Sequence, residues 1–450
     1  MREPWSIIFR LPVIGTGLSS RWQRQPLRPY THTHLPPRAT RQAHGLRSSS
    51  SSSSSNNNNN NNSPSLSEEM KSRHIPTRSG PWQTSNIHDL HQSLKDHLDL
   101  EPLETPSLTL IPPGFHHVTH NMIVKESQLC EDGAERRHAP GNGDEWKFRV
   151  WAGGHMKFAM PLIRADTNTT EYVRVTEKIT NVRVLGDPKR SRDAKILVTL
   201  TKSFFRDSNL ITNNDNMGNK IHGTESSSNT PEPEVEAESN SGSPRSDSAY
   251  ASASTLLIRE NKHLCFMRHV PPSLQSPAAT ATGGRRLPPP SSFSDPFHAQ
   301  TMTPSRTLLF RFSALSQNAH AIHLDADFTR RVYGIPNLLV QGPLTSVLML
   351  EVLRKALALF VQQNGQLQSS PLVVQEFDYK NLLPLFVDEP MTIACKRAES
   401  GQGSAAQDRW DVWIQKGQGE NEMLAVKGKA LVAPVPVPQK AHNNRNETGR

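Results

Sequence analysis

The sequence predicts an α+β protein in which two β-rich blocks each combine an antiparallel sheet with a helix. Three observations carry this prediction. Runs rich in β-branched and aromatic residues recur in both halves of the chain. Segment 342–362 is apolar around nearly its whole circumference, which is typical of a buried helix. Stretches of Ser, Asn, Pro and Glu separate the blocks, and they bury too little apolar surface to offset the entropy cost of ordering them.

These low-complexity stretches divide the 450 residues into foldable and unfoldable parts. In chain order, the sequence predicts a mitochondrial transit peptide (1–47), a low-complexity linker (48–80), an N-terminal domain (81–270, with a disordered insert at 206–253), a Pro/Ser-rich linker (271–303), a C-terminal catalytic domain (304–434) and a tail (435–450).

The formal net charge of +9 lies largely in the N-terminal segment, which argues against a nucleic-acid surface on the folded domains. That segment is rich in Arg and hydroxyl residues, and its one acid before Glu68 is Glu3. This composition is typical of a mitochondrial transit peptide, so we expect a matrix location. The alternative is an unstructured basic tail that has no targeting function. No window reaches the ~20 apolar residues of a membrane span.

The N-terminal block is predicted to begin with a helix at 85–98, because apolar residues recur there near helical spacing. Gly153 and Gly154 interrupt the first long β-run and predict a bulge or bend. The expected strands of this block are 146–160, 172–185, 196–205 and 255–268. Five histidines, at 116, 117, 120, 138 and 155, lack metal-ligand spacing and are expected to be solvated.

The C-terminal block is predicted to contain a strand at 308–313, followed by the apolar helix 342–362. Pro343 suits the first turn of that helix, where its missing N–H costs no hydrogen bond. The later strands are expected at 373–381, 391–396, 409–415 and 423–432. The three cysteines, Cys130, Cys265 and Cys395, have no metal-binding spacing and are expected to be reduced thiols.

A polar cluster formed by Asn318, His320 and His323 precedes the apolar helix. This order places an imidazole, a side-chain amide and the helix N-terminus at Gly342 within reach of one small substrate. An imidazole exchanges protons near neutral pH, and a helix N-terminus stabilises negative charge.

The motifs of this segment resemble a known family. Residues 313–323 match a pattern SAL-x-x-N-x-H-x-IH, and GPL (342–344), IPPG (111–114) and WAGG (151–154) match further landmarks. The chain resembles the MaoC-like hydratases and dehydratases of the hot-dog fold, most specifically the fungal mitochondrial 3-hydroxyacyl-thioester dehydratases and mesaconyl-C4-CoA hydratase relatives. Hot-dog hydratases generally carry D-x-N-P-x-H, where this chain has Asn318 at the Asp position.

The resemblance implies a tandem double hot-dog, a pseudo-dimer within one chain that is either a monomer or a dimer. It implies reversible dehydration of (3R)-3-hydroxyacyl thioesters in mitochondrial type II fatty acid synthesis, on acyl carrier protein or CoA, without metal or cofactor. His323 would be the base, Asn318 would hold the hydroxyl or water, and the N–H of Gly342 would polarise the thioester carbonyl. His320, Gln341 and Leu344 would contact the substrate, and the helix would wall an acyl tunnel.

Two departures from the family pattern keep alternatives open. Gln341 stands where many relatives have His, and Ala321 where many have Arg. One alternative is a hydratase of a branched or dicarboxylic enoyl-CoA, and another is a hot-dog protein that binds acyl thioesters without catalysis. Asn318 could also serve only as a turn residue that satisfies backbone groups, and His320 could only orient its neighbours.

Overall fold

The computed structural model of the chain describes residues 65–434, apart from 106–107, 142–144, 160–162, 165–171, 188–193, 208–253, 276–290, 366–370, 399–407 and 418. The predicted transit peptide, nearly all of the predicted insert at 206–253 and the predicted tail therefore lie outside the described residues.

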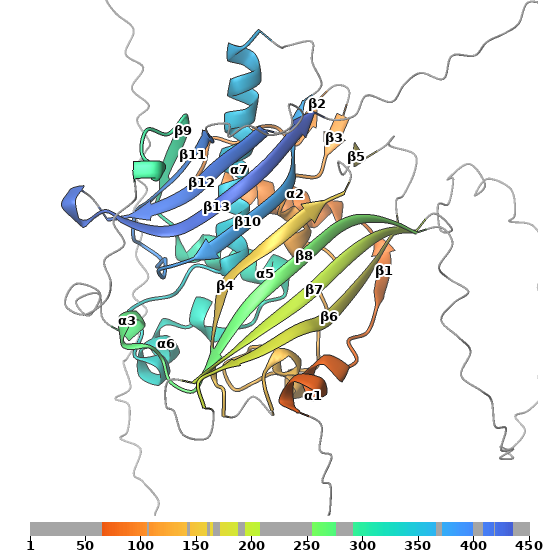
Figure 1. Cartoon of the computed structure of the whole chain (residues 1–450), viewed down its shortest axis with the longest axis vertical. Helices are drawn as coiled ribbons and strands as arrows, with labels where there is room; N and C mark the ends of the chain where they lie inside the picture. Colours follow the sequence, from red (N-terminus) through yellow and green to blue (C-terminus); the bar gives the residue numbers. More distant parts are fainter. Residues whose placement is uncertain are drawn as a thin grey trace, which may run out of the picture. The chain divides into compact units, whose positions relative to one another are not determined.

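One antiparallel sheet of ten strands organises the protein (Figure 1). From one edge to the other, the strands are β1 (Arg78–Pro81), β6 (Tyr172–Leu185), β7 (Lys195–Asp207), β8 (Ser254–Met267), β4 (Phe148–Phe158), β10 (Leu372–Asn381), β13 (Met423–Pro434), β12 (Asp408–Lys416), β11 (Met391–Arg397) and β9 (His298–Met302). A small second sheet contains β2 (Glu104–Thr105), β3 (Leu108–Leu110) and β5 (Ile163–Arg164).

The two halves of the large sheet repeat one topology. Numbered along the chain within each half, the strands lie in the order 1-3-4-5-2, counted inward from each outer edge. The inner strands β4 and β10 pair antiparallel, for example Tyr379 with Gly154, and so join the halves into one sheet. This duplicated arrangement confirms the predicted α+β double hot-dog and its pseudo-dimeric organisation.

Two of the predicted linkers contain regular elements. Helix α1 (Leu66–Ser72) and most of β1 fall within the predicted linker 48–80, and β9 falls within 271–303. A capping box between Ser65 and Glu68 starts α1, and its Met70 is fully buried. Short edge elements of this kind leave little periodicity in the sequence, so composition alone assigns them to linkers.

The predicted strand at 308–313 is wrong, because these residues belong to helix α5 (Arg306–Ser316). The side chain of Ser305 caps the helix by accepting a hydrogen bond from the N–H of Leu308. Leu308, Leu309 and Phe312 then share one buried face. A six-residue segment with four apolar residues fits a strand or a helix equally well, and only packing decides between them.

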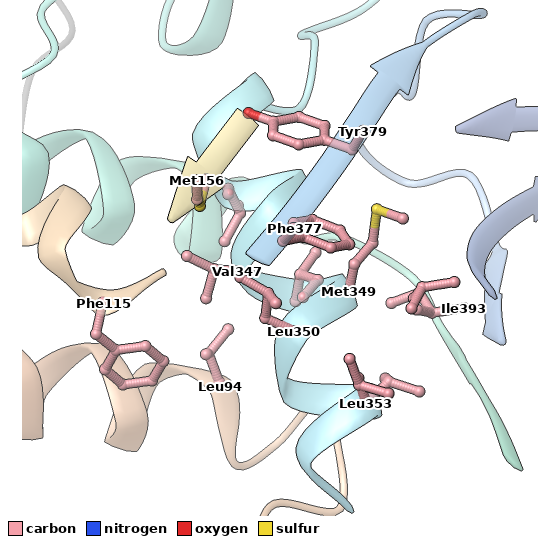
Figure 2. Packing of buried hydrophobic residues seen from close by; sticks show 14 of the residues in the cluster. Leu94, Phe115, Met156, Val347, Met349, Leu350, Leu353, Phe377, Tyr379 and Ile393 are labelled. Atoms are coloured by element: carbon pink, nitrogen blue, oxygen red, sulfur yellow. The ribbon is translucent and has the colours of Figure 1, made fainter. Parts of the chain in front are cut away.

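Helix α7 (Gly342–Gln363) is the long apolar helix that the sequence predicts. It packs on β9, β10, β11 and β12 of its own half, and it also contacts β4. Leu94 of α2 (Thr84–Leu94) and Phe115 of η1 (Phe115–Val118) belong to the same hydrophobic core as Val347 and Leu350 of α7 (Figure 2). One core therefore spans both halves.

Strand β4 carries the predicted bulge. Its register against β8 shifts between Trp151 and Gly153. A Cβ atom on Gly153 would lie 2.2 Å from the carbonyl oxygen of Tyr379, and its φ of +145° favours glycine. The two glycines thus allow β4 and β10 to approach closely.

Short helical segments complete the described fold: η2 (Glu126–Gln128), η3 (Arg136–His138), α3 (Pro272–Gln275), η7 (Ser291–Phe293), η8 (Ala321–His323), α6 (Ala326–Tyr333) and η9 (Gly419–Asn421). Within the described residues, none of the helices has the length and apolarity needed to cross a bilayer.

Candidate active site

A cavity of about 970 Å³ is lined by residues of both halves. The C-terminal half supplies Asn318, His320 and His323 from the segment after α5, and Gly342 from the start of α7. The N-terminal half supplies side chains of β4, β6, β7 and β8. The structure therefore brings His323 and Gly342 to one cavity, as the sequence analysis requires.

His323 ends the short helix η8, and its partly buried ring is fixed by one hydrogen bond. Its Nδ1 lies 2.7 Å from the carbonyl oxygen of Leu339. A carbonyl can only accept, so Nδ1 carries the proton and Nε2 of the neutral ring keeps its lone pair. Burial, with a smaller contribution from the neighbouring His320 ring, lowers the pKa of His323 to about 3. The ring is thus held as a neutral base at physiological pH.

His320 is buried beside a carboxylate from the other half of the protein. Its Nε2 lies 3.0 Å from Oδ2 of Asp132, which also accepts a hydrogen bond of 2.7 Å from the Tyr333 hydroxyl. The N–H of Ala134 donates to the other oxygen of Asp132. Burial alone would raise the pKa of the Asp132 carboxyl, but His320 and these donors outweigh it and hold that pKa well below its usual range.

The sequence analysis missed Asp132, which lies in the loop between η2 and η3, far from the motif in sequence. Its carbonyl oxygen accepts a hydrogen bond of 2.7 Å from the N–H of Ala321. A Cβ on the next residue, Gly133, would lie 2.2 Å from the carbonyl oxygen of Ala319. An isolated Glu-Asp-Gly triplet carries no catalytic signal, and only the fold brings it to the histidines.

The Asn318 side chain serves the local backbone as well as the cavity. Its Oδ1 accepts a hydrogen bond of 3.2 Å from the N–H of His320, which is the geometry of an Asx turn. No hydrogen bond is found for the side-chain NH₂ within the described residues, so it can donate to a substrate. The residue also lines the cavity, so Asn318 can shape the turn and still donate a hydrogen bond into the site.

Gly342 is the first residue of α7, where backbone N–H groups have no intrahelical acceptor and the helix dipole is positive. The indole of Trp151 packs directly on it: a Cβ at this position would lie 2.5 Å from Cγ of Trp151. The indole Nε1 donates a hydrogen bond of 2.9 Å to the Tyr379 hydroxyl, which fixes the ring. Glycine is therefore needed here for space.

Gln341 and Leu344 lie behind the cavity rather than in its lining. Gln341 is fully buried, and its Nε2 donates to the carbonyl of Leu309 and to the hydroxyl of Ser313, both at 2.9 Å. These bonds tie the start of α7 to α5. Leu344 is fully buried in the hydrophobic core. In this geometry both side chains position the site and neither touches its open space.

The predicted acyl tunnel along α7 is absent from the lining of this cavity. From α7, the residues that line it are Gly342, Pro343 and Thr345, all in the first turn. The rest of the apolar face is filled by core side chains such as Val347 and Leu350. The cavity instead extends over the strands of the N-terminal half.

The prediction that the N-terminal histidines are solvated is wrong for His116, His117 and His120, which are buried. Nitrogens of His116 and His117 and a carboxylate oxygen of Glu260 lie within 4.8 Å of one another, a set that could meet one metal ion. The ammonium of Lys262, however, already lies 3.7 Å from Glu260. Burial lowers the pKa of both histidines, so they are neutral here.

Comparison with known proteins agrees with the motifs. The sequence profile of the family described as hydroxyacyl-thioester dehydratase type 2 matches residues 114–252 and 243–387, more than half of the chain. The chain belongs to this family. The resemblance inferred from the sequence is thereby confirmed, as is the class of enzyme that it implied, a dehydratase.

Two relatives cover very different shares of this chain. The mitochondrial hydroxyacyl-thioester dehydratase type 2 of Schizosaccharomyces pombe is 24% identical over 314 residues, covering 68% of this chain and 85% of that protein. The mesaconyl-C(4)-CoA hydratase of Chloroflexus aurantiacus is 36% identical over 97 residues, covering 22% of this chain and 30% of that protein.

Solved structures with similar folds include a MaoC-like dehydratase from Phytophthora capsici. It is 11% identical, with a TM-score of 0.44, and the match covers 82% of this chain and 98% of that one. A Mycobacterium tuberculosis protein described as a double hotdog fold is 13% identical, with a TM-score of 0.38, and the match covers 80% of this chain and 96% of that one.

Proposed function

We propose that this protein catalyses the reversible dehydration of (3R)-3-hydroxyacyl thioesters to trans-2-enoyl thioesters. One observation carries the proposal: the unprotonated Nε2 of His323 and the first turn of α7 belong to the same cavity. The first can take a proton from carbon, and the second can stabilise the negative charge that this creates on oxygen.

In the dehydration direction, Nε2 of His323 takes the proton from C2 of the substrate. The N–H of Gly342 and the helix dipole stabilise the thioester oxygen as it becomes enolate-like. The C3–O bond then breaks, and the imidazolium returns the proton to the departing hydroxyl, which leaves as water. The NH₂ group of Asn318 can hold that hydroxyl but cannot titrate, so the acid and base steps both fall to one imidazole.

The Asp132–His320 pair supports this imidazole. The rings of His320 and His323 lie 5.5 Å apart in an edge-to-face arrangement. Asp132 is ionised, and its charge favours the imidazolium that forms on His323 during the reaction. In the resting site the pair fixes the loop that carries His323. We assign Asp132 and His320 as positioning residues.

The carrier and the cellular role belong to the proposal as well. Similarity to a relative named as mitochondrial and the Arg-rich, acid-poor segment 1–47 favour a matrix enzyme of type II fatty acid synthesis that acts on acyl carrier protein. The second candidate is hydration of a branched or dicarboxylic enoyl-CoA. Similarity to a mesaconyl-C(4)-CoA hydratase and the charged side chains of the cavity favour it.

The test is a spectrophotometric hydration assay with the purified full-length chain. Crotonyl thioesters of CoA and of acyl carrier protein are compared, and loss of the enoyl absorbance reports turnover. We expect hydration of both, faster on the natural carrier. A folded protein that binds crotonyl-CoA without changing its absorbance would instead be a non-catalytic acyl-thioester-binding protein.

A further inference from the structure

The wall of the cavity in the N-terminal half carries an unusual set of charged side chains. Arg78, Glu177, Lys202 and Lys262 all line it, from strands β1, β6, β7 and β8. Lys202 is 2% exposed and Glu177 9% exposed. Ionised groups at this depth are costly unless they are paired, so the pairing of each charge is informative.

Two buried carboxylates, Glu177 in this wall and Glu260 outside the lining, each have a cationic partner. Glu177 lies 3.5 Å from Arg78 and 3.2 Å from His138. Glu260, directly behind the wall, lies 3.7 Å from Lys262. The adjacent His116 and His117 are neutral, because burial lowers their pKa values. Arg78 and Lys262 therefore balance the two acids.

Lys202 is a third cation of this wall and lies opposite Glu260 in the pairing of β7 with β8. None of the ion pairs among the described residues includes it, and its ammonium donates one hydrogen bond, of 3.1 Å, to Oδ1 of Asn121. It also lies 5.0 Å from the centre of the Phe204 ring. Burial, and then repulsion from Lys262, lower the pKa of Lys202 to about 7, although Glu177 and Glu260 act in the opposite direction. An anion bound beside this amine would favour its protonated form and could accept hydrogen bonds from its remaining donors.

This cationic wall is close to the reacting centre. The ammonium of Lys262 lies 5.7 Å from the centre of the Trp151 ring, and that ring packs on Gly342. Nε2 of His117 lies 3.2 Å from the hydroxyl of Ser346, in the first turns of α7. An apolar chain that covered this wall would remove water from its charged groups without replacing the lost hydrogen bonds.

We infer that Lys202 binds a carboxylate at the far end of the acyl chain, so that the enzyme prefers dicarboxylic acyl thioesters over neutral ones of equal length. The inference rests on the proposed function for the position of the thioester. It assigns the substrate class, and it favours the second candidate named above, a dicarboxylic enoyl-CoA, over the neutral acyl chains of fatty acid synthesis.

The test uses substrate pairs that differ only at the far end, such as trans-2-hexenedioyl-CoA and trans-2-hexenoyl-CoA, together with pairs of five to eight carbons. In the wild-type enzyme we expect a higher kcat/KM for the carboxylate member of at least one pair. Lys202→Met keeps the side-chain length and removes the charge. It should reduce this preference about 10- to 100-fold, the loss typical of one charge-assisted hydrogen bond. Lys202→Arg should retain part of the preference.

A matched control separates this effect from a general effect on the sheet. Lys178→Met makes the same change at an exposed position of β6, opposite Thr201, the residue before Lys202. It should leave the preference as in the wild type. Equal rates on both members of every pair in the wild-type enzyme, or an equal loss on both members in Lys202→Met, would overturn the inference.

Binding measurements keep the result independent of catalysis. The unreactive saturated thioesters adipyl-CoA and hexanoyl-CoA are titrated against wild type and Lys202→Met by calorimetry. Tighter binding of adipyl-CoA that is lost in the variant supports the inference even if no thioester is turned over, in which case the proposed function alone fails. If free adipate or acetate binds at Lys202 while adipyl-CoA gains no advantage over hexanoyl-CoA, the site holds small anions and the inference is wrong.

Discussion

The two halves of the sheet share one strand order but differ in what covers it. In the C-terminal half, the 22-residue helix α7 fills the inner face with apolar side chains. In the N-terminal half, the 11-residue helix α2 and the single turn η1 pack against α5, and side chains of β6, β7 and β8 line the cavity. The C-terminal half thus buries one long apolar helix, whereas the strands of the N-terminal half both contribute to the hydrophobic clusters and line the cavity.

This difference shows how a duplicated fold divides its tasks. In the proposed mechanism, the C-terminal half supplies the base and the helix terminus, while the N-terminal half supplies much of the cavity lining and a carboxylate, Asp132, that positions the base. Neither half would then contain the whole site. The shared core, in which Phe115 packs with α7, predicts that the two halves unfold together.

The largest effect is expected for His323→Ala, which tests whether the chemistry belongs to the C-terminal half. Loss of the one positioned acid and base should lower the turnover of crotonyl thioester by ~10²–10⁴. His155→Ala removes an imidazole from β4, in the N-terminal half, and should have little effect. Wild-type turnover in a folded His323→Ala protein would remove the basis of the mechanism.

Leu350→Ala tests whether the core is common to both halves. Leu350 is fully buried, and its Cδ1 would lie 3.1 Å from a Cβ on Gly114 of the other half. We expect a loss of about 2–5 kcal/mol in the free energy of unfolding, in one cooperative urea transition. Val332→Ala, at a position 55% exposed, serves as the control. Separate transitions for the two halves would contradict a common core.

Asp132→Asn asks whether the N-terminal half takes part in the reaction. The amide keeps the shape but removes the charge beside His320, so kcat should fall about 10- to 100-fold through poorer placement and weaker stabilisation of the imidazolium. KM should change little, which a purely structural role would not predict. Tyr333→Phe removes only one donor to this carboxylate and should have a smaller effect. Unchanged kcat in Asp132→Asn would confine the site to the C-terminal half.

Gly342→Ala tests the contact at which the halves meet most closely. The added methyl group would overlap the Trp151 ring, so either the ring or the start of α7 must move. We expect a cost of about 1–3 kcal/mol in stability, and a lower kcat measured on the same samples. Gly80→Ala, where no atom lies within 4 Å of the new Cβ, is the matched control. Equal stabilities of the two variants would show that Trp151 adapts freely.

The smallest effect is expected from mild acid. The folded-state pKa of His323 is about 3, whereas the unfolded value is about 6.5. The unfolded chain therefore binds more protons below pH 6.5, and stability falls as the pH falls through that value. Between pH 7 and pH 6, the titration of His323 should lower the free energy of unfolding by roughly 1 kcal/mol or less. The lowered pKa values of His116, His117 and His320 act in the same direction. Thermal unfolding followed against pH measures this, and a Tm that rises toward pH 5 would show that the opposite sign holds.

Much of the fold was predictable from the sequence because long elements leave long patterns. Helix α7 and the strands β4, β6, β7 and β8 were placed to within a few residues, and the bulge at Gly153 followed from the paired glycines. Segment 308–313 was misassigned, because a short apolar run has the same composition in a strand and in a buried helix. Strands β1 and β9, both at sheet edges, were hidden by their linker-like composition.

The sequence by itself determined the family, the double fold and the local order of His323 and Gly342, since these depend on residues close together in the chain. The tertiary structure decided that Asp132 pairs with His320, that Gln341 lies behind the cavity and that Lys202 faces into it. Pairings between residues far apart in sequence depend on packing across the two halves. No local pattern of hydrophobicity or charge records such contacts.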